Sequence, residues 1–233
     1  MNKLIIANWK LNPLTVEEAR KLAGKIKKNT KNTVVLCPPS VFLSSVKYTN
    51  LGAQDCFWMQ KGPFTGQVSP LMLKKMGVEY CLVGHSERRA VGETEEQIHA
   101  KIKALLDVKI VPVLCIGYDT KVDQDELDVV DVLKKQLQLA LEGVNPKKVV
   151  VAYEPVWAIS SGNNYNNHAV ATAEHAEKIA IFIKNKYKGV KVLYGASANP
   201  NNAQSFLSQR NVDGLLVGGA SLIPEDFNKI ISI

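Results

Sequence analysis

Three polar residues stand directly after apolar runs and carry side chains suited to catalysis: Lys10, His85 and Glu154. Glu154 follows the run Val149–Tyr153, and Trp157 comes three positions later. A carboxylate in such surroundings is partly removed from water, which raises its pKa toward the working range of a general base. Glu154 is therefore the first candidate for a catalytic base.

His85 opens the sequence His-Ser-Glu-Arg-Arg, which is typical of a helix start. The positive end of a helix disfavours an imidazolium, so we expect a neutral His85 that donates a hydrogen bond. The frame Gly84–Arg88 lacks the final glycine of a nucleophile elbow and does not favour a serine hydrolase.

Small polar residues and glycines follow the late apolar runs and could hold a phosphate. Ser160, Ser197 and the pair Gly218-Gly219 offer hydroxyl and backbone N–H donors. Segment Pro155–Gly162 is short, partly apolar and ends in small residues, which suits a lid that excludes water. An ordinary loop between a strand and a helix is the alternative for this segment.

The elements that must position these residues alternate between short apolar runs and amphipathic segments. The runs are continuous rather than alternating, as in strands of a parallel sheet covered on both faces. The third is the weakest, because Gln54 and Asp55 interrupt it. The runs are Leu4–Ala7, Thr33–Cys37, Leu51–Asp55, Tyr80–Val83, Ile110–Ile116, Val149–Tyr153, Lys191–Tyr194 and Gly214–Val217.

Helix start signals lie between the runs. Thr15-x-x-Glu18 and Thr94-x-x-Gln97 are capping boxes, and Pro224 suits the first turn of a last helix. Segment 125–142 has a helical stripe that Lys134 interrupts. The stripe consists of Leu127, Val130, Lys134, Leu137 and Leu141.

Eight strand-then-helix units predict an α/β fold, a single (β/α)8 TIM barrel with parallel strands, in one domain over residues 1–233. A doubly wound open sheet is less favoured, because Asn8–Pro13 after the first run contains no G-x-G-x-x-G. In a barrel, residues just past the C-terminal ends of strands face the ligand site, so the candidates above should converge. Asn8 and Glu87 belong to the same predicted rim.

Composition excludes several other classes. The net charge is +7, but only four of the 29 basic residues are Arg, which argues against a nucleic-acid partner. The four cysteines have no C-x-x-C spacing, and the histidines form no H-E-x-x-H pair, so neither a disulfide framework nor a metal site is predicted. No apolar run is long enough for a signal peptide or a membrane span, and we expect a cytoplasmic protein.

A carboxylate base, a neutral His, a Lys and a phosphate cradle, without metal or cofactor, fit proton abstraction beside a carbonyl on a small phosphorylated compound. Two alternatives remain open. One is a phosphate-binding barrel without turnover, and the other is an aldolase that uses Lys10 as a Schiff-base amine.

Along essentially the whole chain the sequence resembles the triosephosphate isomerase family. The matching stretches are Asn8-Trp9-Lys10, Val83–Arg89, Cys115-Ile116-Gly117, Ala152–Ile159, Tyr194–Ser197 and Gly214–Ser221. The family performs a cofactor-free interconversion of dihydroxyacetone phosphate and glyceraldehyde 3-phosphate, in glycolysis and gluconeogenesis. Its chemistry rests on a Glu base and a neutral His.

The resemblance implies a role for each matching residue. Glu154 would be the base, His85 the electrophile, and Lys10 the cation that stabilises the enediolate. Glu87 and Cys115 would support the site. Phosphate and substrate contacts would come from Asn8, Lys10, Ser160, Ser197, Gly218 and Gly219.

The resemblance also implies a homodimer in which loop 57–70 inserts into the partner; a self-packed Ω-loop is the alternative. This chain departs from the family pattern near the site. Ser160-Ser161-Gly162 replaces Gly-Thr-Gly in the lid, Gln67 replaces an interface Glu, Tyr118 a common Glu, and Ala196 a Gly.

Overall fold

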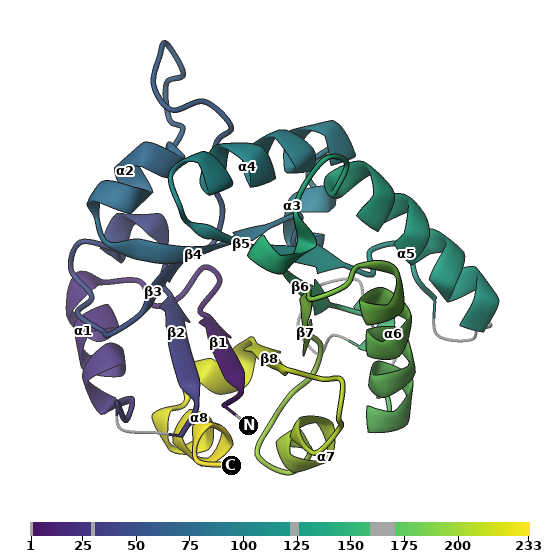
Figure 1. Ribbon diagram of the computed structural model, residues 1–233. Coiled ribbons are helices and arrows are strands. Elements are labelled where there is room, and N and C mark those ends of the chain that lie inside the picture. Colours follow the sequence, from purple (N-terminus) through teal and green to yellow (C-terminus); the bar gives the residue numbers. More distant parts are fainter. Residues whose placement is uncertain (1, 29–30, 122–125, 159–170) are drawn as a thin grey trace.

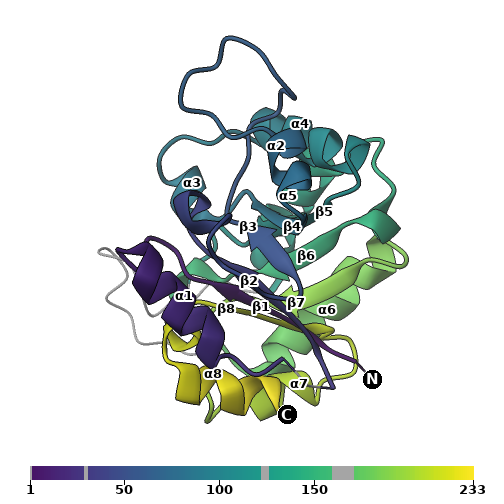
Figure 2. The ribbon, with the colours of Figure 1, turned by 90° about the vertical axis from the view of Figure 1, so that its left-hand side faces the viewer.

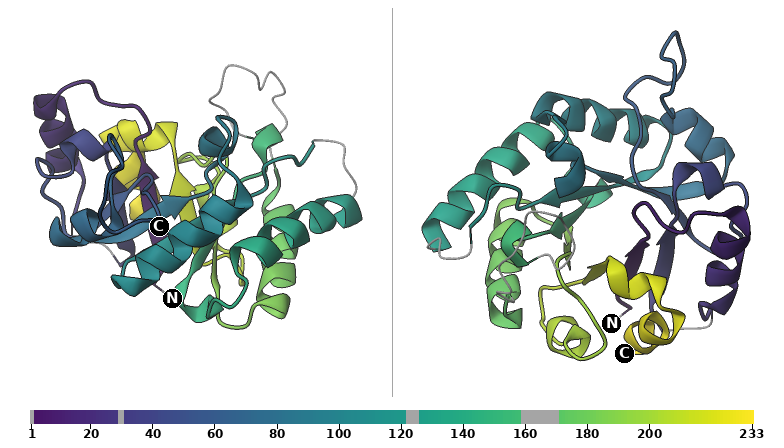
Figure 3. Two further views of the ribbon diagram at one scale, coloured as in Figure 1. Left: turned by 90° about the horizontal axis from the view of Figure 1, so that it is seen from above. Right: turned by 180° about the vertical axis from the view of Figure 1, so that it is seen from behind.

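The computed structural model describes residues 2–28, 31–121, 126–158 and 171–233. Its eight strands pair in chain order, all in parallel, and close into one barrel because β1 pairs with β8. Helices surround the strands on the outside (Figure 1), as the view from behind also shows (Figure 3). The predicted fold class is confirmed.

Each predicted apolar run forms a strand, with ends that differ by at most two residues. The third strand is short because the two residues after it leave the sheet for side-chain contacts: Gln54 donates to the carbonyls of Lys10 and Cys37, and Asp55 pairs with Arg88 and Lys101. The strands are β1 Leu4–Asn8, β2 Thr33–Cys37, β3 Leu51–Ala53, β4 Val78–Val83, β5 Val111–Ile116, β6 Val150–Tyr153, β7 Lys191–Tyr194 and β8 Gly214–Val217.

The helices start where the capping signals predict. Both capping boxes form, with Thr15 at the start of α1 and Thr94 at the start of α4, and Pro224 opens α8. The α-helices are α1 Val16–Lys25, α2 Pro70–Lys75, α3 Ser86–Arg89, α4 Glu95–Asp107, α5 Glu126–Ala140, α6 Ala173–Lys186, α7 Ala203–Leu207 and α8 Pro224–Ile231. Short 3-10 helices are η1 Ser40–Phe42, η2 Pro146–Lys148, η3 Val156–Ala158 and η4 Gly219–Leu222.

The stripe predicted for α5 is wrong in part. Leu127 is 76% exposed, and the face that packs on the barrel carries Val129, Leu133, Leu137 and Ala140 instead. Lys134 is exposed, so it does not interrupt the buried face. Successive residues of a helix point in very different directions, so an error of one or two positions assigns a side chain to the wrong face. Because α5 carries Leu and Val on both faces, its sequence was compatible with two different buried stripes.

The strands divide their side chains between two cores. One core lies between strands and helices and holds, for example, Ile5 and Ala7 of β1. The other is built from alternate strand residues, such as Leu4 and Ile6, and fills the barrel interior. Because the interior is packed, a ligand can be held only at the barrel's ends.

The four cysteines are buried and form no disulfide with one another. Within the described ranges, no helix is long and apolar enough to cross a membrane.

Barrel closure depends on Gly214 at the start of β8. A Cβ there would lie 1.8 Å from the Leu4 carbonyl oxygen of β1, whereas a Cβ on Gly24 in α1 would meet no atom within 4 Å. We expect Gly214→Ala to lower the free energy of unfolding by about 3 kcal/mol or more, because β1 and β8 must separate. The matched control Gly24→Ala should raise it by about 0.5–1 kcal/mol. Urea unfolding checks both, and a Gly214→Ala protein as stable as wild type would contradict this account of closure.

Candidate active site

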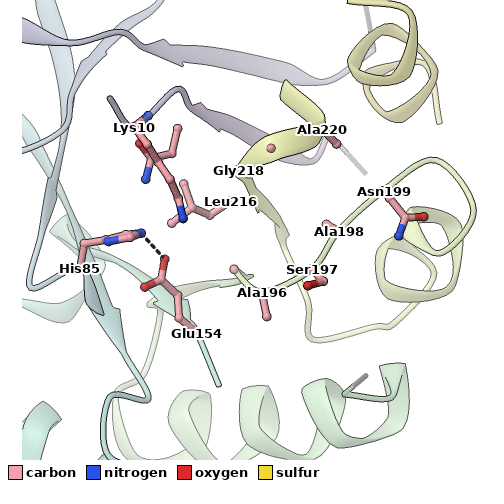
Figure 4. Close-up of a pocket in the computed structure, with 13 residues that line it drawn as sticks. Lys10, His85, Glu154, Ala196, Ser197, Ala198, Asn199, Leu216, Gly218 and Ala220 are labelled. Atoms are coloured by element: carbon pink, nitrogen blue, oxygen red, sulfur yellow. Dashed lines mark hydrogen bonds and ion pairs between the residues drawn. The ribbon is translucent and has the colours of Figure 1, made fainter. Parts of the chain in front are cut away.

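A pocket of about 120 Å³ opens at the C-terminal ends of the strands. The side chains of Lys10, His85 and Glu154 converge on it from β1, β4 and β6 (Figure 4). Residues after β7 and β8 form the opposite wall. The pocket is lined by Asn8, Lys10, His85, Glu154, Gly195, Ala196, Ser197, Ala198, Asn199, Leu216, Gly218, Gly219 and Ala220. Its size suits a small molecule.

Glu154 directly follows β6, and only 2% of its surface is exposed. Burial raises the pKa of this carboxyl, while the neighbouring His85 and Lys10 act in the opposite direction. Its Oε1 lies 3.4 Å from His85 Nε2, and the Ser86 N–H and the Cys115 thiol also favour the ionised form of the carboxyl. A buried carboxylate that lies beside a histidine at a pocket wall can take up a proton from a ligand.

Gly195, after β7, leaves the space that the Glu154 side chain occupies. A Cβ at this position would lie 2.8 Å from Glu154 Cγ and 3.4 Å from Oε1. Any larger residue would therefore push the carboxylate out of its present place. The sequence did not indicate this role of Gly195, although the residue lies within the motif Tyr194–Ser197.

His85 caps the N-terminus of α3, as its sequence context predicts. The backbone N–H of Glu87 donates to His85 Nδ1 at 3.2 Å. Because Nδ1 accepts this bond, the proton of the neutral ring lies on Nε2, the nitrogen that faces Glu154. The ring is therefore oriented to donate a hydrogen bond into the pocket.

Lys10 has the left-handed backbone conformation, with φ of 53°, which is uncommon for a residue other than glycine. Two hydrogen bonds hold it: its N–H donates to Asn8 Oδ1 at 3.0 Å, and Gln54 Nε2 donates to its carbonyl at 2.8 Å. The Lys10 Nζ lies 2.7 Å from Glu87 Oε1. The role of Gln54 in holding Lys10 was not predicted, because in the sequence Gln54 is only a polar interruption of an apolar run.

The wall opposite Glu154 contains Ser197, Gly218 and Gly219, as predicted for a phosphate cradle. Ser197 is already engaged: its hydroxyl donates to the Ala158 carbonyl at 2.7 Å, and its N–H donates to the same oxygen at 3.3 Å. Ser197 thus ties the turn after β7 to the segment after β6. Ser160 and the rest of the predicted lid beyond Ala158 lie outside the described residues.

The two predicted supporting residues take different positions. Cys115, at the end of β5, is buried beside Glu154; burial raises the pKa of its thiol, and the nearby carboxylate adds to the effect. Glu87 lies on the far side of His85 and pairs with Lys10. Among the described residues, no group of three His, Cys, Asp or Glu side chains could hold a metal ion.

The departures from the family pattern fall in different places. Ala196 lines the pocket with its side chain buried. The carbonyl of Tyr118 accepts a hydrogen bond from Gln136 of α5. Gln67 lies in loop 57–70, beside a second cavity. None of these three positions is one of the three catalytic candidates, Lys10, His85 and Glu154.

Known proteins of one family are similar to this chain over nearly its whole length. A family model described as triosephosphate isomerase matches residues 3–233. Three similar proteins, each named triosephosphate isomerase, come from Caldanaerobacter subterraneus subsp. tengcongensis, Aquifex aeolicus and Alkaliphilus metalliredigens. Each is 40% identical to this chain, and the matches cover 98–100% of this chain and of the relative.

The raised pKa of Glu154 has a consequence for stability. The folded state favours the neutral carboxyl, so the ionised form destabilises it at a pH above the ordinary value of 4.5. Glu154→Gln should therefore raise the free energy of unfolding at about pH 8, by on the order of 1 kcal/mol. This gain should shrink as the pH falls toward 4.5, where the carboxyl becomes protonated in both states.

Urea unfolding at several pH values measures this effect. Glu142→Gln, the same change at an exposed position, serves as the control and should show no such pH dependence. A Glu154→Gln protein that is less stable than wild type at pH 8 would contradict the expected burial penalty.

Proposed function

The chain belongs to the triosephosphate isomerase family and catalyses the isomerisation of triose phosphates, and we propose that it does so in the pocket between Glu154 and His85. The observation that carries this assignment is the pairing of a buried carboxylate with an imidazole whose Nε2 proton faces it. The two groups supply the base and the electrophile that an aldose–ketose isomerisation requires.

In the proposed reaction, Glu154 removes a proton from C1 of dihydroxyacetone phosphate. The C–H electron pair moves into a C1–C2 double bond, the C2 carbonyl oxygen becomes an enediolate oxygen, and Glu154 becomes neutral. The carboxylic acid then returns its proton to C2, and His85 relays the proton of the C1 hydroxyl to the enediolate oxygen on C2. C1 becomes the aldehyde of glyceraldehyde 3-phosphate, and C2 carries its hydroxyl. A carboxyl with a raised pKa suits both transfers, because it must bind and release the proton near neutral pH.

His85 and Lys10 face the oxygens on which negative charge develops. Donation from His85 Nε2 polarises the carbonyl, and preorganised donors in a buried site stabilise an oxyanion strongly. The Lys10 ammonium lies in an ion pair with Glu87, which places a positive charge at the pocket rim. An ammonium in an ion pair is not a nucleophile, so this geometry does not support the Schiff-base aldolase alternative.

The phosphate is assigned to the wall formed by Ser197, Gly218 and Gly219, with Asn8 and Ser160 as further contacts. Gly218 and Gly219 have no side chain that would shield their backbone N–H groups from a phosphate. The reaction requires no cofactor, since proton transfer between two carbons needs only an acid–base group and an oxyanion site. The alternative of a binding protein without turnover has no support in the site, because the catalytic groups are oriented toward one another.

A homodimer is the proposed assembly, formed through loop 57–70. The loop projects away from the barrel between β3 and α2 (Figure 2), and its Met59 and Phe64 expose apolar surface. The ring of Phe57 packs on those of Trp58 and Phe64. Part of the loop is therefore packed on itself, which is what the alternative of an Ω-loop predicts.

The end of the barrel at which the active-site pocket opens offers a place for the loop of a second copy. A cavity of about 440 Å³ adjoins the active-site pocket, and its rim includes Leu11, which is 86% exposed. A twofold arrangement would bury this leucine and the loop's apolar tip in both copies at once. Asn8, Lys10 and His85 line this cavity too, so the partner loop would cover the open side of the active site.

We further propose that residues 1–233 form one domain and that the protein works in the cytoplasm, in glycolysis and gluconeogenesis. Its substrate is a small phosphorylated triose, and we assign it neither a nucleic-acid nor a membrane partner. The scarcity of Arg and the absence of a suitable helix in the described part of the chain support the last statement.

The base assignment predicts the effect of Glu154→Gln on catalysis. We expect kcat for glyceraldehyde 3-phosphate to fall by about 10³-fold, because general base catalysis is lost. The dissociation constant for inorganic phosphate should change by less than about twofold, because the phosphate wall is unaltered. A coupled assay and calorimetry measure the two quantities, with Glu142→Gln as the exposed control. Turnover by Glu154→Gln near the wild-type rate would disprove the assignment.

The dimer proposal predicts that Leu11→Glu weakens self-association. A charge at the covered leucine should raise the dimer dissociation constant at least about tenfold. Leu127→Glu, at the exposed leucine on α5, is the matched control and should leave association unchanged. Sedimentation velocity at micromolar concentrations distinguishes the two variants. A wild-type protein that is monomeric there, or a Leu11→Glu protein as dimeric as wild type, would contradict this interface.

A further inference from the structure

The turn after β5 lies directly against the main chain of Glu154. Gly117 has φ of 112°, and a Cβ there would lie 2.5 Å from the Glu154 carbonyl oxygen and 2.8 Å from its carbonyl carbon. One residue earlier, the Ile116 carbonyl accepts the Glu154 N–H at 2.7 Å. The peptide groups on both sides of the Glu154 Cα are therefore in contact with this turn.

A glutamine on α5 holds the turn in place. Gln136 Oε1 accepts the Gly117 N–H at 2.9 Å, and Gln136 Nε2 donates to the Tyr118 carbonyl at 2.7 Å. Only 6% of Gln136 is exposed, and it stands next to Leu137 on the buried face of the helix. Burying an amide on an apolar face is unfavourable unless its hydrogen bonds are made, and here both ends of the amide are bonded to the same turn.

A second side chain fixes the carbonyl of Gly117. Thr120 is buried, and its hydroxyl donates to the Gly117 carbonyl at 2.6 Å. Both backbone polar groups of Gly117 are thus engaged, the N–H by Gln136 and the carbonyl by Thr120. Gly117 cannot move away from Glu154 without breaking one of these bonds.

On its other side, Glu154 has equally little space. Gly195 packs against its Cγ, as described above, and the Gly195 N–H donates to the Tyr153 carbonyl at 2.8 Å. Glu154 is therefore held on two sides: the β5 turn contacts its main chain, and Gly195 contacts its side chain. A displacement of the Glu154 backbone must change the position of its Oε1 relative to His85 Nε2.

We propose that Gln136 is a positioning residue for Glu154: through Gly117 it sets where the main chain of the base lies, and so where the carboxylate meets the substrate carbon. This inference rests on the proposed function, in which Glu154 is the base. Gln136 lines neither the active-site pocket nor the cavity beside it, and it acts only through the turn.

The decisive experiment separates catalysis from binding in Gln136→Met, which keeps the length of the side chain and removes both hydrogen bonds. We expect kcat for glyceraldehyde 3-phosphate to fall by about tenfold to a hundredfold, since a misplacement of about 1 Å can have that effect. The dissociation constant for inorganic phosphate should stay within about twofold of wild type. The kcat is calculated per folded enzyme, which the stoichiometry of phosphate binding measures. A purely structural role would lower the folded fraction and leave the kcat per folded enzyme unchanged.

Gln138→Met is the matched control, because Gln138 lies on the same helix but is exposed. The proposal is overturned if folded Gln136→Met has a kcat within twofold of Gln138→Met. If Gln136→Met does not fold, Thr120→Val decides: it removes only the hydroxyl bond to Gly117 and should lower kcat by about threefold to tenfold. An unchanged kcat in Thr120→Val would then overturn the proposal.

Glu154→Gln is measured in the same assay. If that variant keeps its turnover, the proposed function itself fails. If it loses turnover while the Gln136 and Thr120 variants keep theirs, only the positioning role fails.

Discussion

The site depends on the burial of one carboxylate at the end of β6. Glu154 is enclosed by the ends of β5, β6 and β7, and its charge is opposed by desolvation and favoured by His85 and Lys10. A carboxylate in water would be a weaker base and would be free to change rotamer. Here Gly195 leaves room for the side chain of Glu154 and Gly117 leaves room for its main chain, so a larger residue at either position would displace it. The gain in reactivity is obtained at the expense of folding stability, a trade that is common at catalytic sites.

The barrel places the remaining groups around this carboxylate. Lys10, His85 and Glu154 are far apart along the chain, but each stands just beyond the C-terminal end of a strand, and a closed parallel barrel gathers those ends on one face. Local interactions then orient each side chain. The Glu87 N–H selects the tautomer of His85, and the Gln54 amide holds Lys10 in its left-handed conformation. These interactions act on the catalytic residues without touching the pocket's interior.

The parts of the structure that the sequence could predict are those set by repeated or local patterns. Continuous apolar runs identified the strands, and Thr15 and Thr94 marked their helices, because burial and capping leave direct traces in the residue types. The rim residues Lys10, His85 and Glu154 followed from the barrel rule. The stripe on α5 was wrong because leucines occupy both faces of that helix, and only packing selects Leu133 over Leu127. Gln54, Gly195 and Gln136 could not be predicted, since their roles depend on contacts between elements distant in sequence. Ser197 was predicted as a phosphate contact, and its bond to the Ala158 carbonyl had no sequence signal.

The central claim is that Glu154 carries a proton between solvent and the carbon beside the carbonyl. The most direct test is the incorporation of deuterium at that carbon, followed by NMR while the enzyme acts on triose phosphate in D₂O. Wild-type protein should incorporate deuterium, because the protonated carboxyl exchanges with solvent before it returns its hydrogen. The Glu154→Gln protein, shown to be folded and able to bind inorganic phosphate, should incorporate none above the background rate. Incorporation by Glu154→Gln at the wild-type rate would contradict the account, because another group would then be the base.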